Sequence, residues 1–191
     1  MSALPTSGVL SFGFERSAEH VHQGVDLVAP ERTSVFAPVS GTIEQASAGL
    51  ESGFSGYGGH VVLRTNESKP RWLLFAHLWG VDVTPGESVV RGQALGSVGR
   101  TCYTREDPGK LCDGAHLHFE VSPRAYPQDS EAARLDPVAW LAKHDAHPLV
   151  AKQPAEPRKS TSTAAAVAAF VVTAAAMVVG YLAARSIGGR A

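Results

Sequence analysis

The sequence predicts a mainly β domain, an antiparallel sheet sandwich or open barrel, followed by a separate C-terminal transmembrane helix. Three observations support this prediction. Glycine and proline turn signals recur through the first 122 residues too often for long helices. Hydrophobic residues make up 44% and charged residues 18% of the 191 residues, which suits a packed core. Finally, a long uncharged segment lies near the C-terminus.

Short apolar runs separated by turn residues predict the strands. They are residues 35–43, 60–65, 71–78 and 116–121. Runs of this length, bounded by turns, are typical of an all-β sandwich or barrel. One short helix is expected at the end of the domain, because Asp136 is a suitable N-cap and Pro137 suits the first turn. We expect this helix to lie over the sheet as a lid.

The rest of the chain divides by composition. Residues 1–146 form the predicted domain, and 147–163 are rich in proline, alanine and serine, as in a mobile linker. Residues 164–184 are uncharged and, as a helix, would span roughly 30 Å, the thickness of a bilayer core. A short basic tail, 185–191, follows. Because ten of those 21 uncharged residues are alanine, a helix packed on a partner protein is the alternative to a membrane anchor.

Charge excludes one class of partner. The net charge is −1, but Lys152 onward holds five basic residues and one acidic residue. The preceding residues therefore carry twelve basic and seventeen acidic side chains. Phosphate contacts need clustered lysine and arginine, so nucleic acid is not an expected partner. The first ten residues lack both a positive charge and an apolar stretch, so no secretory signal peptide is expected.

Two histidine motifs have the spacing of a metal site. His22 and Asp26 are four residues apart, and His116 and His118 are two apart, so on strands each pair shares one face. Two histidines and an aspartate with an open position is the ligand composition of a catalytic zinc site. His77 lies in an apolar run and would need a polar partner if buried. The alternative for each motif is an ordinary surface strand.

With these motifs the chain resembles the lysostaphin-type zinc endopeptidases of peptidase family M23, which cut peptidoglycan peptides. The resemblance covers about residues 8–141. The matching motifs, in family order, are His22-x-Gly24-x-Asp26, Val35-x-Ala37-Pro38-x-x-Gly41, Gly56-Tyr57-Gly58-Gly59, Ala76-His77-Leu78, Gly86-x-x-Val89-x-x-Gly92-Gln93-x-x-Gly96-x-x-Gly99 and His116-Leu117-His118-Phe119-Glu120.

The resemblance implies a role for each of five residues. His22, Asp26 and His118 match the zinc ligands, one Zn²⁺ per chain, and His77 and His116 match the two catalytic histidines. Because none of the five is missing, the resemblance favours an active metalloprotease. The two catalytic histidines would orient the nucleophile and stabilise the oxyanion, and the spacing leaves open which does which.

Other positions near these motifs are weaker candidates. Tyr57, in the glycine turn, and His60, at its end, are candidate substrate-binding residues, although a solvent-facing His60 is an alternative. Cys102 and Cys112 bracket a charged loop that departs from the shortest family pattern. A disulfide between them would stiffen a wall of the cleft just before His116, and two free thiols are the alternative.

The predicted function is zinc-dependent hydrolysis of peptide bonds in peptidoglycan, in the stem or the cross-bridge. The catalytic domain is expected on the wall side of a membrane, held by the C-terminal helix, and a phage lysis or virion protein would explain the missing export signal. The alternatives are a non-catalytic wall-binding module and a histidine phosphocarrier of related β architecture. Asp26 argues against the phosphocarrier, because a carboxylate repels a phosphohistidine.

Overall fold

The computed structural model describes residues 4–17, 21–49, 54–126 and 134–144. Within them the chain forms one helix, α1 (Pro137–His144), and strands β1 (Val9–Phe12), β2 (Glu15–Arg16), β3 (Val21–His22), β4 (Val25–Val28), β5 (Ser34–Phe36), β6 (Gly41–Ser47), β7 (His60–Thr65), β8 (Trp72–Ala76), β9 (Leu78–Val81), β10 (Ser88–Val89), β11 (Ala94–Thr101) and β12 (Leu111–Ser122).

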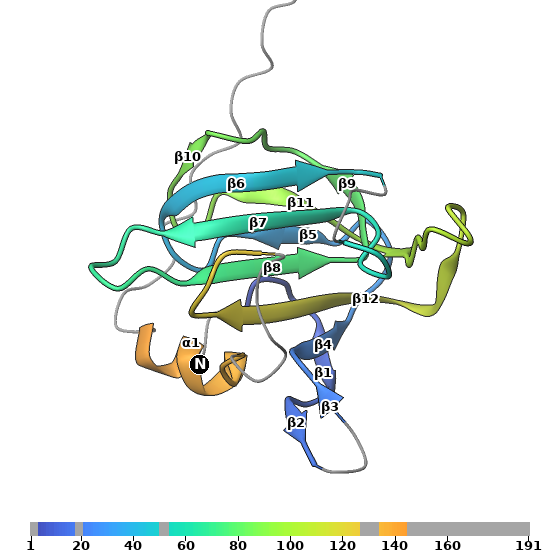
Figure 1. Ribbon diagram of the computed structural model, residues 1–191, viewed down its shortest axis with the longest axis horizontal. Helices are drawn as coiled ribbons and strands as arrows, with labels where there is room; N and C mark the ends of the chain where they lie inside the picture. The colour runs from blue at the N-terminus through green and yellow to red at the C-terminus, as the bar shows by residue number, and fades with distance from the viewer. Residues whose placement is uncertain (1–3, 18–20, 50–53, 127–133, 145–191) are drawn as a thin grey trace, which may run out of the picture. The chain divides into compact units, whose positions relative to one another are not determined.

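Antiparallel pairing joins these strands. The main sheet has the order β1-β4-β12-β8-β7-β6-β10. β11 pairs with β12 at one end and also with β5 and β9, which extends the sheet into a second layer behind the first (Figure 1). β2 and β3 form a separate hairpin. The prediction of a mainly β antiparallel fold is therefore confirmed.

The two faces of β12 have different chemistry. Leu117, Phe119 and Val121 belong to the large buried core, which also contains side chains of β5, β9 and β11. The alternate residues His116, His118 and Glu120 therefore lie on the other face of the strand. The apolar face holds the strand in place, and the polar face is free to build a site.

The predicted strands are correct in position, and two of them are divided. Residues 60–65 form β7, whereas 35–43 splits into β5 and β6 around a turn that includes Pro38. Residues 71–78 split into β8 and β9 at His77, which has a φ of 62°. A left-handed residue interrupts a strand, and this conformation is costly for a side chain other than glycine.

The predicted helix is present as α1. The Oδ1 atom of Asp136 accepts hydrogen bonds from the backbone nitrogens of Val138, at 2.9 Å, and Ala139, at 3.3 Å, as an N-cap should. Trp140 and Leu141 are buried in the main core, and the helix packs on β12. It thus anchors the end of the strand that carries the histidine pair.

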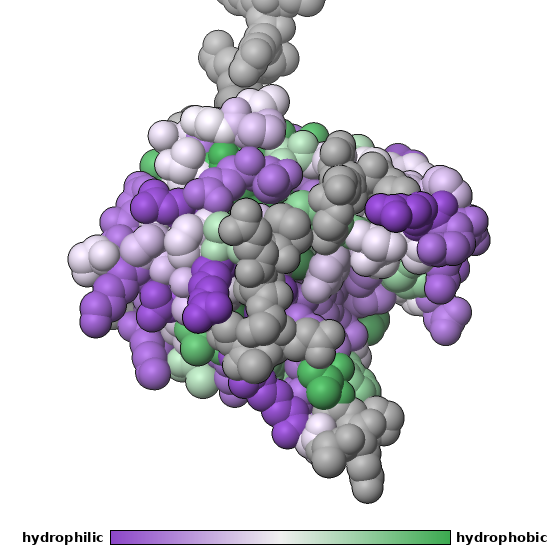
Figure 2. All heavy atoms as spheres, viewed as in Figure 1, coloured by the Kyte–Doolittle hydropathy of each residue, from purple (hydrophilic) through white to green (hydrophobic). Residues whose placement is uncertain are grey.

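The outer surface is mostly hydrophilic on the face shown in Figure 2. A hydrophobic group lies near β1 and β3, where Val9, Phe12 and Val21 are exposed. The Phe12 ring stands edge-on to that of His22, with centroids 4.9 Å apart. Of these exposed side chains, Phe12 thus lies directly beside a candidate metal ligand.

No helix in the described part of the chain is long and apolar enough to span a membrane. The predicted domain end near 146, the linker 147–163, the segment 164–184 and the tail 185–191 all lie outside the described residues.

Candidate metal centre

The three predicted metal ligands meet at one point. His118 on β12 is paired with Asp26 on β4, and His22 comes from β3. The Nδ1 atom of His118 is 2.8 Å from Oδ1 of Asp26 and 3.2 Å from Nε2 of His22, and the latter is 3.3 Å from the same aspartate oxygen. Strand pairing therefore brings together residues up to 96 positions apart in the chain.

The route from His22 to Asp26 differs from the predicted one. The two residues lie on separate strands, joined through Gln23 and Gly24, and not on one continuous strand. An added Cβ at Gly24 would lie 2.5 Å from the carbonyl oxygen of Phe119 and 3.0 Å from Cε1 of His118. Only glycine allows the chain to pass this close to β12. The bend replaces strand alternation as the reason that both side chains face the same point.

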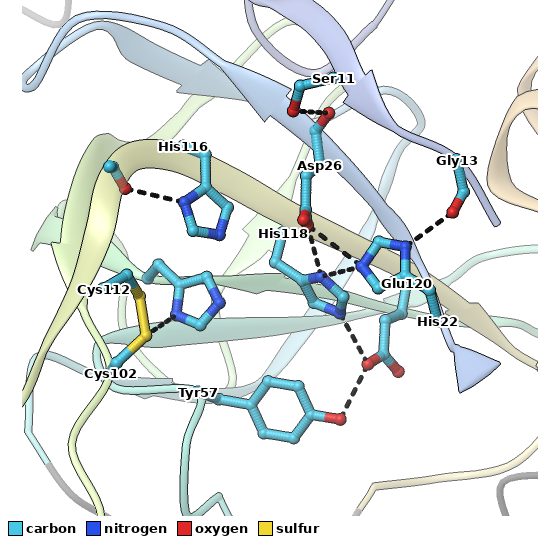
Figure 3. A network of polar contacts seen from close by, with 12 residues as sticks. Ser11, Gly13, His22, Asp26, Tyr57, Cys102, Cys112, His116, His118 and Glu120 are labelled. Carbon is cyan, nitrogen blue, oxygen red and sulfur yellow. Dashed lines mark hydrogen bonds and ion pairs between the residues drawn. A yellow bond between two sulfur atoms is a disulfide. The ribbon is translucent and has the colours of Figure 1, made fainter. Parts of the chain in front are cut away.

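Each ligand histidine has its second ring nitrogen occupied. The Nδ1–H of His22 donates to the carbonyl oxygen of Gly13 at 2.7 Å, which leaves Nε2 toward Asp26. The Nε2 atom of His118 lies 3.0 Å from Oε1 of Glu120, which leaves Nδ1 toward Asp26 (Figure 3). Such partners orient the rings of metal-binding histidines. Nε2 of His22 and Nδ1 of His118 therefore point to the same place as the carboxylate.

Burial and neighbouring charges shift the pKa values of the three candidate ligands. Burial alone would raise the pKa of Asp26, but hydrogen bonds with His118 and His22 hold it well below its usual range. Burial alone would lower the pKa of His118, but hydrogen bonds with Asp26 and Glu120 raise it to about 9. The hydrogen bond with Asp26 also raises the pKa of His22. Asp26 is thus a carboxylate, as a metal ligand must be.

The donor set fits a zinc ion. Two ligands about 2.0 to 2.1 Å from a tetrahedral zinc lie about 3.3 Å apart. The three distances of 2.8, 3.2 and 3.3 Å come close to this value without any backbone movement. Two imidazoles and one carboxylate are the donors of a catalytic site that keeps its fourth position open. His22, Asp26 and His118 are therefore the residues able to hold Zn²⁺.

The two predicted catalytic histidines lie beside this centre. The ring centroids of His77 and His116 are 4.7 Å apart, and those of His77 and His118 are 5.8 Å apart. The Nδ1–H of His116 donates to the carbonyl oxygen of Gly114 at 2.9 Å (Figure 3). Its Nε2 atom is thereby left for the cleft.

His77 is held between β8 and β9 by backbone groups. Its backbone nitrogen donates to the carbonyl oxygen of Tyr57 at 2.9 Å, and its Nδ1–H donates to that of Thr101 at 2.8 Å. Burial, followed by the nearby charge of His118, lowers its pKa to about 4. His77 is therefore neutral near pH 7, with an unprotonated Nε2. Its positive φ is strain of the kind that accumulates at functional sites.

One cleft of about 360 Å³ contains all of these groups. Tyr57 lines it, and the Tyr57 hydroxyl donates to Oε1 of Glu120 at 2.8 Å. Its contact with substrate remains a prediction. The full lining comprises His22, Gln23, Asp26, Ser55, Gly56, Tyr57, His77, His116, His118 and Glu120.

The prediction for His60 is wrong in both forms. Its side chain is neither in the cleft nor in solvent but fully buried, at 0% exposure. The ring stacks on Phe54, with centroids 4.0 Å apart, and Nδ1 contacts the carbonyl oxygen of Gly58 at 2.8 Å. His60 begins β7, a strand whose residues are buried on both faces. Through its contact with Gly58 it supports the glycine turn from within the core.

Cys102 and Cys112 form a disulfide, as one of the two sequence alternatives proposed. Sγ of Cys102 lies 3.6 Å from Nδ1 of His77, so the bridge, which Figure 3 shows, lies next to this histidine. Cys112 also lies near His77 and His116 in a group with metal-ligand spacing. Metals bind the thiolate, and a sulfur in a disulfide has none, so this second group is not a metal site while the bridge is closed.

Sequence reasoning missed one residue of the site. Glu120 was included only as the last letter of the histidine motif, yet it contacts both His118 and Tyr57. Its further partners, Tyr126 and Arg134, follow outside the motif. The available signal was the spacing: on a strand Glu120 shares a face with His116 and His118.

The fold and the site define a class. An antiparallel sheet that presents a His, His and Asp donor set beside two further histidines is the arrangement of a metallopeptidase. The model of the family described as Peptidase family M23 matches residues 20–130, and the chain belongs to this family of peptide hydrolases.

Solved structures agree with this assignment. The catalytic domain of the antimicrobial peptidase lysostaphin from Staphylococcus simulans is similar over 71% of this chain and 92% of its own length, at 26% identity and a TM-score of 0.56. Whole lysostaphin matches at 24% identity and a TM-score of 0.58, over 81% of this chain and 56% of its own.

A more distant structure shares the fold. A zinc-containing peptidase from Vibrio cholerae matches over 70% of this chain and 37% of its own length, at 22% identity and a TM-score of 0.51. No curated protein matches the chain by sequence.

Proposed function

We propose that this protein is a zinc-dependent endopeptidase that hydrolyses peptide bonds in peptidoglycan, with one zinc ion per chain. The observation that supports it most is the convergence of Nε2 of His22, Oδ1 of Asp26 and Nδ1 of His118 within 3.3 Å of one another. Two further histidines stand beside this point in the same cleft. The choice of peptidoglycan draws on the motif resemblance and on the likeness to the lysostaphin catalytic domain.

The ion, when bound, supplies Lewis-acid chemistry: it polarises a carbonyl group and makes water acidic enough to react near neutral pH. The chain supplies proton transfer and charge stabilisation. His77 is neutral, and its Nε2 is able to accept a proton from the attacking water. His116, whose Nδ1–H donates to Gly114, presents its Nε2 to the same cleft, and in its protonated form this nitrogen would donate to the carbonyl oxygen.

A wall-binding module and a histidine phosphocarrier are the competing functions. A module without activity does not need His77 in a strained conformation or two histidines beyond the ligands. In a phosphocarrier, a phosphoryl group on His118 would face the carboxylate of Asp26, now 2.8 Å from the ring, and like charges at this distance repel. Within the described ranges, no observation favours either alternative.

The direct test is Asp26→Ala, measured by metal analysis and by cleavage of purified peptidoglycan. The wild-type protein is expected to bind one zinc per chain, and the variant is expected to lose most of it and all measurable cleavage. Asp82→Ala is the matched control, because Asp82 is an exposed aspartate outside the cleft. A full complement of zinc in the Asp26 variant, or wild-type protein without zinc, would contradict the proposal.

We also propose that residues 164–184 tether the enzyme to a membrane, with the domain on the wall side. The support comes from the sequence alone: an uncharged run of 21 residues, basic flanks and a proline-containing linker. The 17 residues from 147 to 163 have a root-mean-square reach of roughly 20 to 25 Å, which suits a substrate close to the bilayer. A role in phage lysis or in a virion is part of this proposal.

Fractionation tests the tether. Full-length protein is expected in the membrane pellet after an alkaline carbonate wash, and a version that ends at Ser160 in the supernatant. If both stay in the supernatant, the segment is not an anchor, and packing against a partner protein replaces it.

A further inference from the structure

A buried carboxylate lies at the floor of the cleft. Glu120 has 0% exposure, although an unpaired charge in such a place is very costly. Its Oε1 atom accepts a hydrogen bond from the Tyr57 hydroxyl at 2.8 Å and lies 3.0 Å from Nε2 of His118. One carboxylate oxygen therefore faces a zinc-ligand candidate directly.

The second oxygen of the Glu120 carboxylate has partners on the side away from His118. Oε2 of Glu120 accepts from the Tyr126 hydroxyl at 2.8 Å and forms an ion pair with Nε of Arg134. The Arg134 guanidinium lies over the Tyr126 ring, 4.3 Å from its centroid. Arg134 balances the charge of Glu120, so the carboxylate adds a fixed hydrogen-bond acceptor to the cleft without adding net charge.

We propose that Glu120 is a positioning residue that selects the His118 tautomer able to bind metal; the inference rests on the proposed zinc function. A neutral imidazole carries one N–H. Both ring nitrogens of His118 face carboxylate oxygens, Nδ1 that of Asp26 and Nε2 that of Glu120. A metal ion shared by Asp26 and Nδ1 would replace the proton between them, and the remaining N–H would then stay on Nε2, where Glu120 accepts it. Nδ1 then keeps its lone pair, and this is the atom that converges with Asp26 and His22.

Packing also restricts how the His118 ring can move. A Cβ at Gly24 would lie 2.9 Å from Cγ of Glu120 and 3.0 Å from Cε1 of His118, so the backbone at this turn is pressed against both side chains. This contact limits rotation of the His118 ring. The two flipped orientations fill nearly the same space, and only the observed one places ring nitrogens, and not C–H groups, against the carboxylate oxygens of Asp26 and Glu120.

The competing interpretation is structural. Glu120 and Arg134 form a buried ion pair, and removing one partner of such a pair destabilises a fold whatever its function. The two interpretations differ in what metal binding should show. A purely structural pair changes the free energy of unfolding and leaves the zinc affinity of the folded protein alone, whereas a positioning residue changes the affinity and the ligand geometry.

The experiment measures zinc affinity of the full chain by competition with a chromophoric chelator, and ligand geometry from the visible spectrum of the Co²⁺ form. For Glu120→Ala we expect about 10- to 100-fold weaker zinc binding and an altered Co²⁺ spectrum. Glu120→Gln should recover most of the affinity, because its amide oxygen still accepts from Nε2–H of His118. The control is Ser122→Ala, a buried residue two positions along the same strand.

The outcomes separate the claims. Wild-type zinc affinity and spectrum in Glu120→Ala, or a Glu120→Gln variant as weak as the alanine variant, would overturn the inference while leaving the zinc function intact. Wild-type protein without zinc overturns the proposed function itself. If Glu120→Ala does not fold, Glu120→Leu combined with Arg134→Met removes both charges together and is measured in its place, with the same expected loss of affinity.

Discussion

The cleft has two halves that use the same residue type in opposite ways. In the ligand half, His22 and His118 both contact the Asp26 carboxylate, and a second partner holds each ring, a backbone carbonyl oxygen for His22 and the Glu120 carboxylate for His118. In the catalytic half, His77 and His116 are held by backbone carbonyl oxygens. Carboxylates raise the pKa of His118 to about 9, whereas burial lowers that of His77 to about 4. Rings 5.8 Å apart are thus tuned for different tasks by their partners.

One sheet face thus supports both binding and catalysis through the choice of hydrogen-bond partner. A carboxylate partner keeps positive charge at the ligand half, where a metal ion replaces the proton. At His77 the carbonyl partner fixes the ring without favouring the charged form strongly enough to overcome burial. The neutral ring is then available to take a proton during the reaction.

Two variants, His77→Ala and His116→Ala, should separate zinc binding from cleavage most clearly. Each variant should keep its zinc and lose about 100-fold or more of its cleavage rate, since the missing groups act on the transition state. Zinc content and turnover of purified peptidoglycan are measured on the same samples, next to Asp26→Ala, which should lose both. Normal turnover by either histidine variant would place catalysis elsewhere.

Removing the disulfide should affect the catalytic half alone. With both Cys102 and Cys112 replaced by serine, the free energy of unfolding should fall by about 2 to 3 kcal/mol, because the closed loop of ten residues no longer restricts the unfolded chain. Cleavage should fall as well, since Thr101, whose carbonyl oxygen holds Nδ1 of His77, is next to the bridge. Denaturant unfolding, zinc content and cleavage rate are the measurements.

Thr104→Ala is the control for this experiment, because Thr104 lies in the same loop and its hydroxyl oxygen accepts only the local hydrogen bond from Asp107 in the described residues. A disulfide variant that loses zinc as readily as it loses cleavage would show that the bridge supports both halves.

The smallest effect is a pH dependence of stability in the chelator-treated protein. The pKa of His118 is raised above its unfolded value of 6.5, so its contribution is complete below that pH and is lost as pH rises through about 9. The pKa of His77 is lowered, so its contribution is present above pH 6.5 and is lost as pH falls toward about 4. Stability should therefore peak near pH 6.5.

Thermal unfolding between pH 4.5 and 9.5 measures this profile. We expect Tm to fall by roughly 5 °C or more toward either end. His118→Asn should flatten the alkaline side, and His77→Asn the acidic side. A profile that keeps its alkaline fall in the His118 variant would show that another group causes it.

The sequence alone predicted the antiparallel β class, the capped helix at Pro137 and the five residues of the centre. The class and the helix depend on local rules, since turn residues bound strands and Asp and Pro start a helix. Alternation puts His116 and His118 on one face, and the roles of the five residues come from the motif resemblance. The C-terminal segment remains a prediction from composition.

Tertiary structure decided what those residues can do. The opposite tuning of His77 and His118, the burial of His60 and the choice between a disulfide and free thiols all depend on distances between residues far apart in the chain. Glu120 is the clearest case, because its contacts with Tyr57 and Arg134 come from a distant loop and from beyond the strand. A pKa or a tautomer follows from burial and from the nearest polar atoms, and these exist only once the chain has folded.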